Sequence, residues 1–184
     1  MTKILVHLAE GFEEMEALVP VDVWRRAGFN VVTISISNQL TVRGSHHISV
    51  VADQLFDASL YSQAEMIFLP GGIPGATHLD AHEGLREQLL SFHQQGKVLG
   101  AICAAPLILG HNQLLQGKMA TCFPGFEKEL YGATYSNSSV VTDGQVITGK
   151  GAGVALEFAL EVVAHFKGKE FAEDIAKKMQ VHEI

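Results

Sequence analysis

The stretch Val98-Leu99-Gly100-Ala101-Ile102-Cys103-Ala104-Ala105-Pro106 decides the fold predicted for this chain. It is typical of an apolar strand that ends in small residues and a thiol, with a helical stretch beginning directly afterwards. Such a junction needs a sharp turn, which places the Cys103 side chain at the mouth of a sheet. Backbone N–H groups at the helix start then face the thiol, and with the helix dipole they stabilise an anion. The pattern predicts a nucleophile elbow with cysteine in place of serine, and a depressed thiol pKa.

The same nine residues also allow a purely structural interpretation. A free cysteine is often a small, buried and unreactive residue, and a crowded packing point between a strand and a helix would suit Cys103. This stretch alone leaves both interpretations open, so the choice depends on the rest of the chain.

Strand-like and helix-like segments alternate along the whole sequence. Strands are predicted at residues 3–9, 30–37, 65–69 and 98–102, with a peripheral hairpin at 40–52 and a second hairpin at 140–148 around Asp143-Gly144. Helices are predicted at residues 14–27, 83–95, 104–111, 153–166 and 169–179. This alternation favours an α/β fold with a mostly parallel sheet and helices on both faces. The loops 10–13 and 70–75 and the Cys103 turn would then meet at the carboxyl ends of the strands.

Composition narrows the class of protein. The chain has 184 residues, which predicts one domain spanning residues 1–184, and its formal net charge of −7 makes nucleic acid an unexpected partner. No apolar run is long enough to span a bilayer, and the N-terminal segment does not resemble a signal peptide. The two cysteines, Cys103 and Cys122, form no CxxC motif. These features argue against a disulfide scaffold or a structural zinc site, and they favour a cytoplasmic location.

Two further features belong with the thiol. The acidic run Glu13-Glu14-Met15-Glu16 follows the first predicted strand, where negative charge also stabilises a helix start without any further role. Apolar neighbours suggest that Glu16 points inward, and a buried carboxyl has a raised pKa and can donate a hydrogen bond to a thiolate. The pair Gly71-Gly72 either makes a tight turn or lets backbone N–H groups approach an oxyanion.

Other motifs are weaker. Residues 144–150 have the spacing of a phosphate loop, but Gly151 stands where a serine or threonine must bind magnesium. The pairs His46-His47 and His78/His82 resemble metal ligands, yet neither has an evident third ligand in the sequence. We therefore predict no metal and no cofactor.

Taken together, the motifs of this chain resemble those of the ThiJ/PfpI superfamily, and most closely the branch of the parkinsonism-associated protein deglycase and its bacterial relatives. The resemblance covers nearly the whole sequence. The segments that carry it are Gly11-Phe12-Glu13-Glu14-Met15-Glu16, Pro20-Val21-Asp22-Val23, Arg25-Arg26-Ala27-Gly28, Leu69-Pro70-Gly71-Gly72, Ala101-Ile102-Cys103-Ala104-Ala105-Pro106, Asp143-Gly144 and Glu157-Phe158-Ala159-Leu160.

The resemblance implies a flavodoxin-like α/β sandwich and a homodimer. It also implies that Cys103 is the reactive cysteine, that Glu16 is its carboxyl partner, and that Gly72 and Ala104 supply oxyanion-hole N–H groups. Ala104 stands where the peptidase branch has a histidine directly after the cysteine.

Two more positions depart from relatives. Cys122 or Phe123 stands where some branch members carry a histidine beside the active cysteine, and His46 stands where some relatives have an arginine. These departures weaken a Cys–His peptidase mechanism and leave a Cys–Glu site.

Two classes of function follow from the resemblance and the site. In the first, Cys103 attacks a methylglyoxal-type aldehyde, free or as an early adduct on a protein, and Glu16 moves the proton in a cofactor-independent glyoxalase or deglycase reaction. In the second, Cys103 is a redox sensor whose sulfinate alters partner binding or chaperone behaviour during oxidative stress. A PfpI-type peptidase or an amidotransferase-like hydrolase is the less favoured third alternative.

Overall fold

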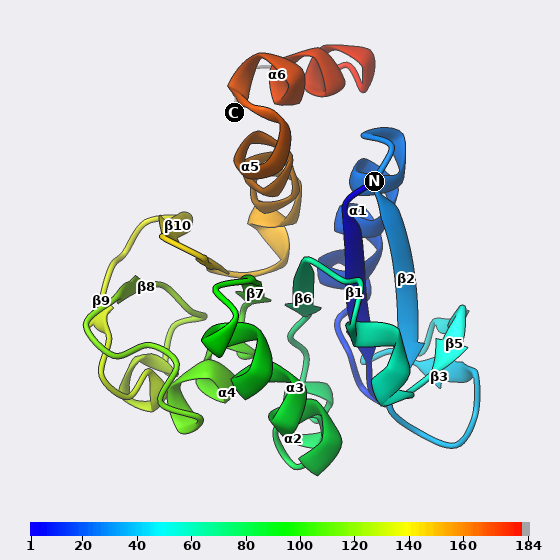
Figure 1. The fold of residues 1–184 in the computed structure, drawn as a ribbon, viewed down its shortest axis with the longest axis vertical. Helices are drawn as coiled ribbons and strands as arrows, with labels where there is room; N and C mark the ends of the chain where they lie inside the picture. The colour runs from blue at the N-terminus through cyan, green and yellow to red at the C-terminus, as the bar shows by residue number, and fades with distance from the viewer. Residues whose placement is uncertain (182–184) are drawn as a thin grey trace.

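The computed structural model describes residues 1–181 and is built around a seven-stranded sheet with helices on both faces (Figure 1). The strand order is β10-β11-β7-β6-β1-β2-β5. Neighbouring strands run parallel except at the β10–β11 hairpin, where Val140 pairs with Gly149 and Asp143 with Val146. The predicted α/β fold with a mostly parallel sheet is confirmed.

The elements have the following bounds. The strands of the main sheet are β1 (Lys3–Leu8), β2 (Asn30–Ser35), β5 (Gln54–Leu55), β6 (Met66–Leu69), β7 (Val98–Ile102), β10 (Val140–Asp143) and β11 (Val146–Gly149). Two small sheets pair β3 (Thr41–Arg43) with β4 (Ser49–Val51) and β8 (Met119–Ala120) with β9 (Thr134–Tyr135). The helices are α1 (Glu14–Arg26), α2 (Gly75–Asp80), α3 (Glu83–Gln94), α4 (Pro106–His111), α5 (Ala155–Lys167) and α6 (Lys169–Lys178), with 3-10 turns η1 (Ala58–Tyr61), η2 (Glu127–Glu129) and η3 (Ala152–Val154).

Two hydrophobic cores hold the layers together, one on each face of the sheet. On the first face, Trp24 of α1 packs edge-on against Phe68 of β6, with ring centroids 5.0 Å apart, and its indole N–H donates to the Ala159 carbonyl at 3.0 Å. On the second face, Leu89 of α3 and Ile108 of α4 are fully buried with neighbouring apolar side chains. Every residue of β6 and β7 is buried, which agrees with strands covered on both sides.

The structure corrects the start of two predicted helices. The helix after Cys103 begins at Pro106 and not at Ala104, because residues 103–105 make a turn in which the Ala105 N–H donates to the Ile102 carbonyl. Likewise, α5 begins at Ala155, after the η3 turn, and not at residue 153. Short elements without a clear sequence pattern, such as β5 and β8, were absent from the prediction.

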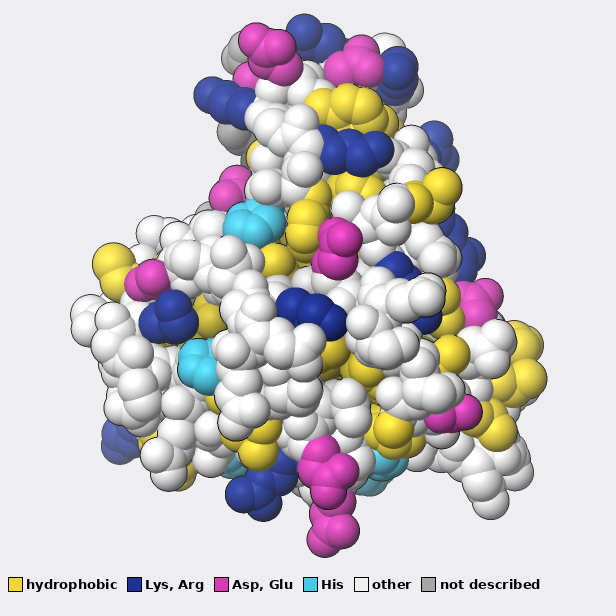
Figure 2. All heavy atoms as spheres, viewed as in Figure 1, with side chains coloured by type: hydrophobic (Ala, Val, Ile, Leu, Met, Phe, Trp, Pro, Cys, Tyr) yellow, Lys and Arg dark blue, Asp and Glu magenta, His cyan; other side chains and the backbone are white. Residues whose placement is uncertain are grey.

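Charges of both signs are interspersed on the face shown in Figure 2. In Figure 1, α6 lies beyond one end of the sheet, and the carboxyl end of β1 points away from it. Within the described residues, no helix combines the length and apolar character needed to cross a membrane.

Candidate functional site

Cys103 occupies a strained turn directly after β7. Its φ of 65° lies in the left-handed region, which costs a residue with a side chain about 1–2 kcal/mol. Two backbone hydrogen bonds hold the turn: the Cys103 N–H donates to the Gly149 carbonyl at 2.9 Å, and the Phe123 N–H donates to the Cys103 carbonyl at 2.8 Å. The thiol is half-buried. This is the backbone geometry of the nucleophile elbow that the sequence predicted.

The loop after β6 brings a carboxyl to the thiol. Gly71 lies between the two groups, because a Cβ added to it would stand 2.6 Å from the Glu16 Oε2 atom and 2.7 Å from the Cys103 Cβ atom. The Gly71 N–H donates to Glu16 Oε2 at 2.9 Å, and its carbonyl accepts the Glu13 N–H at 3.0 Å. The three loops predicted to meet therefore do so, and only a residue without a side chain fits between acid and thiol.

Two backbone N–H groups converge on the sulfur. Those of Gly72 and Ala104 both act on the Cys103 sulfur, where they lower the pKa of the thiol and favour its ionised form. Gly72 has a φ of 89°, which turns its peptide toward the site and is readily adopted only by glycine. These are the two donors that the family resemblance implied for an oxyanion hole, and they are placed where one could form.

Glu16 is almost fully buried, with 1% of its surface exposed. Burial raises the pKa of its carboxyl to about 7, and the nearby Glu13 carboxylate adds to that increase. Hydrogen bonds from Cys103, Gly71 and the Ala152 backbone act in the opposite direction. A carboxyl with this pKa carries and releases a proton near neutral pH, as a general acid–base requires.

The sequence did not identify Ala152 as a contact of Glu16. The only sequence signal near it is the run of alternate glycines at 149, 151 and 153, which is typical of close packing at a helix start. The structure shows that this segment forms the η3 turn, whose backbone reaches the carboxyl.

The ionisation of Cys103 differs from the sequence-based prediction. Burial raises the pKa of its thiol to about 12, the ionised Glu16 carboxylate adds to that increase, and the N–H groups of Ala104 and Gly72 lower it only in part. The predicted depressed pKa is wrong for a thiol that faces an ionised Glu16. The following helix is only six residues long and begins two residues later than predicted, so its dipole contributes little. Protonation of Glu16 removes the repulsion and makes the carboxyl a donor, so the two groups titrate together.

Cys122 has a different environment. It is fully buried and belongs to the core on the α3–α4 face, whereas Cys103 packs against the core on the α1–α5 face. Burial raises the pKa of the Cys122 thiol to about 11. The structure therefore separates the two thiols between opposite faces of the sheet.

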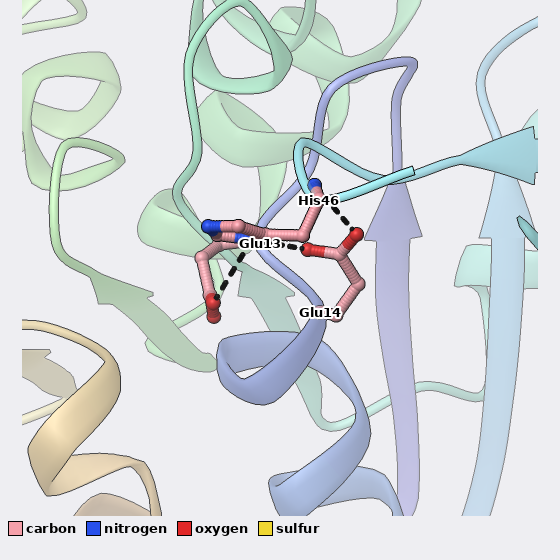
Figure 3. A group of neighbouring side chains, drawn as sticks. All are labelled: Glu13, Glu14 and His46. Atoms are coloured by element: carbon pink, nitrogen blue, oxygen red, sulfur yellow. Dashed lines mark hydrogen bonds and ion pairs between the residues drawn. The ribbon is translucent and has the colours of Figure 1, made fainter. Parts of the chain in front are cut away.

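A second polar cluster lies at the start of α1, and Figure 3 shows its members, Glu13, Glu14 and His46. The imidazole Nδ1 of His46 is 2.9 Å from Glu14 Oε2 and 3.8 Å from Glu13 Oε1. The sequence shows no evident third ligand for the pair His46-His47, but the 44–48 turn brings His46 to two carboxylates that are distant in sequence. The three ligand atoms lie within 4.8 Å of one another, a spacing at which they could hold a metal ion.

Hydrogen bonding accounts for much of this cluster without an ion. Glu14 is buried, and its Oε1 accepts the backbone N–H groups of His46 at 2.8 Å and Ile48 at 3.3 Å. Although burial raises the pKa of Glu14, these bonds and the imidazole lower it to about 2. The Glu14 carboxylate in turn raises the pKa of His46. We interpret the group as an ion pair that fastens the hairpin to α1.

The motif at residues 144–150 does not form a phosphate loop. Val146 and Ile147 lie in β11 and are buried, which agrees with the hairpin predicted at residues 140–148. His78 donates through its Nδ1 to the Glu10 carbonyl at 2.9 Å, and the His82 Nδ1 accepts the Leu85 N–H at the start of α3.

Comparison with known proteins shows which family this chain belongs to. The model of the DJ-1/PfpI family matches residues 2–165. The chain belongs to the DJ-1/PfpI family. The structure of oxidized Toxoplasma gondii DJ-1 is similar to this DJ-1/PfpI protein over the whole of both chains, with a TM-score of 0.95 and 34% sequence identity. The flavodoxin-like α/β sandwich that the resemblance implied is confirmed.

Two curated relatives place this DJ-1/PfpI protein within the family. Protein DJ-1 homolog B of Arabidopsis thaliana is 40% identical over 176 residues, which are 95% of this chain and 40% of that protein. The chain thus spans less than half the length of this plant relative. A Caenorhabditis elegans protein named glutathione-independent glyoxalase DJR-1.2 is 30% identical over 171 residues, covering 92% of this chain and 91% of that protein.

Proposed function

We propose that this DJ-1/PfpI protein is a glutathione-independent glyoxalase or protein deglycase that acts on methylglyoxal-type aldehydes, with Cys103 as nucleophile and Glu16 as acid–base. The observation that carries the proposal is the position of Gly71, which holds the Glu16 carboxyl and the Cys103 side chain on either side of one backbone unit. The similarity to a worm protein named as a glyoxalase supports it.

The reaction needs only the groups of this site. The Cys103 thiolate bonds to the aldehyde carbon, the carbonyl oxygen accepts N–H bonds from Gly72 and Ala104, and protonation gives a hemithioacetal. Glu16 removes the proton from that carbon and returns it to the neighbouring ketone carbon, while the hydroxyl proton of the hemithioacetal moves to the former ketone oxygen. The first carbon is thereby oxidised to a thioester and the second is reduced to an alcohol. Water then cleaves the resulting thioester and releases lactate. Because this redox change is internal to the substrate, no cofactor is required.

An early adduct of the aldehyde on a protein side chain could enter the same sequence. In that case the thiolate attacks the carbon that bears the side-chain nitrogen or sulfur, and the protein group leaves as it gains a proton. The proposed substrates are therefore small aldehydes or glycated proteins, and both use the same four residues.

The direct test is lactate formation from methylglyoxal by the purified wild-type chain without glutathione. We expect lactate to form at a rate proportional to protein concentration and well above the buffer rate. Lactate production equal to that of buffer would contradict the glyoxalase proposal. Release of a free amine or thiol from a pre-formed methylglyoxal adduct tests the deglycase activity separately.

A second candidate function uses the same site as a redox sensor or redox-regulated chaperone. It is favoured by the half-buried thiol with a carboxyl donor and two N–H groups around it, which could hold a sulfinate. The similar Toxoplasma structure is itself of an oxidized form. Oxidation would then change partner binding and not turnover.

Mild peroxide is expected to convert Cys103 to a sulfinic acid without forming a disulfide. Cys122 is fully buried in the opposite core and is poorly placed to resolve a sulfenic acid at Cys103. Intact-mass and peptide mass spectrometry would show a gain of two oxygen atoms on the Cys103 peptide. A Cys103–Cys122 disulfide as the main product would recast the protein as a dithiol switch.

A PfpI-type peptidase or an amidotransferase-like hydrolase is less well supported. Ala104 follows the cysteine where the peptidase branch has a histidine, and the carboxyl of Glu16 takes the position next to the thiol. We also propose that residues 1–184 act as one ThiJ/PfpI-type domain in a cytoplasmic stress response, without nucleic-acid or membrane partners.

The homodimer implied by the family resemblance is proposed to form through α1 and the β3–β4 hairpin. Met15, Ile48 and Val51 are exposed there by 53%, 55% and 68%, and the Glu14–His46 ion pair holds the helix and the hairpin together. We expect Val51→Glu to convert a dimer to a monomer in sedimentation velocity, because a buried charge opposes association. Met119→Glu, at a 49% exposed residue elsewhere, is the control that should stay dimeric. A wild-type chain that sediments only as a monomer would contradict the proposal.

A further inference from the structure

Two exposed apolar side chains are attached to the backbone units that form the Cys103 site. Ile73 directly follows Gly72, whose N–H faces the sulfur, and 55% of its surface is exposed. Phe123 donates its N–H to the Cys103 carbonyl at 2.8 Å, and 47% of its surface is exposed. The surroundings of the thiol therefore include uncovered hydrocarbon surface as well as the polar groups of the proposed reaction.

The ring of Phe123 lies against the backbone that reaches the catalytic carboxyl. A Cβ placed on Gly151 would stand 3.3 Å from the ring Cδ2 atom and 3.9 Å from Cε2, so the phenyl group rests on residue 151. The next residue, Ala152, hydrogen-bonds to Glu16. The backbone of Phe123 is therefore bonded to Cys103, and its ring contacts the segment that reaches Glu16.

Lys150, which precedes Gly151, already has hydrogen-bond partners for its ammonium group. Lys150 donates to the carbonyl and the side-chain oxygen of Asn137. Since this ammonium group is held by its own partners, the exposed part of the Phe123 ring is an apolar surface beside Gly151 and the Cys103 turn. Burying apolar surface is favourable in proportion to its area, and two aromatic rings gain further in offset or edge-to-face contact.

We propose that Phe123 determines substrate specificity, so that the site takes α-oxoaldehydes with an aryl or branched-alkyl substituent in preference to methylglyoxal. This inference rests on the proposed glyoxalase function and deepens it by naming the substrate class. The methyl group of methylglyoxal covers little of the Phe123 ring. The phenyl group of an aryl glyoxal can cover the exposed face of Phe123, and both rings then lose contact with water.

The chemistry remains balanced with the larger substituent. An aryl glyoxal and one water give a 2-aryl-2-hydroxyacetate: the carbon–sulfur bond to Cys103 forms at the aldehyde carbon and breaks when water cleaves the thioester. The aldehyde carbon is oxidised, the ketone carbon is reduced, and Glu16 carries the proton between them. No external oxidant or reductant takes part.

Recognition is tested without turnover by comparing two alkylating agents, iodoacetamide and its N-phenyl derivative, on Cys103. The ratio of their rate constants, divided by the same ratio for glutathione, reports contact with the phenyl group and cancels changes in thiol pKa. We expect a normalised ratio of roughly ten in the wild type, the size of a typical apolar pocket effect. Phe123→Ala should lower it to near one, and Phe123→Leu should give an intermediate value.

Phe171→Ala is the matched control, since Phe171 is 37% exposed but lies on α6. Its ratio should equal that of the wild type, and peptide mass spectrometry confirms that Cys103 is the modified residue. A Phe123→Ala ratio equal to the wild-type ratio would overturn the inference, as would a wild-type ratio near one.

Turnover provides the second measurement. Phe123→Ala should lower kcat/KM for phenylglyoxal, measured as mandelate formed, by roughly tenfold, with much less change for methylglyoxal. If neither aldehyde is turned over but the alkylation ratio behaves as expected, the glyoxalase function fails and the apolar recognition surface stands. The specificity inference alone fails if methylglyoxal is turned over but Phe123→Ala changes neither the normalised alkylation ratio nor the ratio of kcat/KM for phenylglyoxal to kcat/KM for methylglyoxal.

Discussion

Cys103→Ser is expected to reduce methylglyoxal turnover by roughly 10³-fold or more, to near the buffer rate, because the nucleophile acts as a unit with its acid–base partner. A serine hydroxyl holds its proton far more tightly than a thiol, and Glu16, with a pKa of about 7, is too weak a base to remove it efficiently. The Gly72 and Ala104 N–H groups stay in place, so the loss reports the nucleophile and not the oxyanion donors. The measurement is the initial rate of lactate formation without glutathione.

Cys122→Ser is the matched control for that experiment. It makes the same exchange of sulfur for oxygen at a thiol that is buried in the opposite core. We expect it to lose some thermal stability, since a buried hydroxyl needs a partner, and to keep its turnover at temperatures where it stays folded. If Cys103→Ser retained turnover while Cys122→Ser lost it, the assignment of the nucleophile would be wrong.

Glu16→Gln and Glu16→Leu are expected to lower turnover by about 10²–10⁴-fold, because neither side chain can carry a proton between carbon atoms. The two variants should differ in thiol ionisation. Glutamine keeps an N–H donor for the thiolate and carries no charge, whereas leucine leaves the Cys103 sulfur buried without that donor.

The pH dependence of Cys103 alkylation separates the two variants. In the wild type, both groups hold protons below pH 7, and one proton leaves the pair as the pH rises through about 7, the raised pKa of Glu16. Because the proton that remains is shared between the carboxyl and the sulfur, part of the protein then carries a Cys103 thiolate, and reactivity should increase through that range. In Glu16→Leu it should increase only above roughly pH 8.5, the ordinary thiol range, because burial raises the thiol pKa. In Glu16→Gln it should increase at a lower pH than in Glu16→Leu, because the amide N–H donates to the thiolate.

The melting temperature of each Glu16 variant checks that its loss of turnover results from the missing carboxyl and not from unfolding. The folded protein raises the pKa of Glu16 from its ordinary 4.5 to about 7, so the unfolded chain binds fewer protons between those values and stability falls as pH rises through them. Removal of the carboxyl should therefore leave the melting temperature at pH 7 unchanged or higher.

Variants that match the wild type in alkylation profile and turnover would show that Glu16 is only a buried charge at a helix start. A redox sensor without enzymatic turnover would tolerate Gln far better than Leu.

Much of the fold could be predicted because its information is local. Periodic apolar patterns with glycine and Asp143-Gly144 turn signals mark β1, β6, β7 and the β10–β11 hairpin, and the alternation of strands and helices dictates a parallel sheet. The misplaced start of α4 has an equally local cause. The sequence predicted a sharp turn at Cys103, but its side-chain pattern does not show that the turn also takes up the two residues after the cysteine.

The candidate site was likewise predictable where the information is local in the sequence, and not where it depends on contacts between distant residues. The sequence by itself determined that Cys103 follows a buried strand, that Glu16 lies in the first turn of a helix, and that paired glycines follow the strand at residues 65–69. Because the carboxyl ends of parallel strands share one edge of a sheet, it also determined that these segments meet. Only the tertiary structure decided how these groups ionise. Burial and the mutual approach of Glu16 and Cys103 across Gly71 set their pKa values, and both depend on neighbours distant in sequence. The contact of Ala152 with Glu16 was also visible only in the tertiary structure, because a sequence pattern does not show which distant residues come close in space.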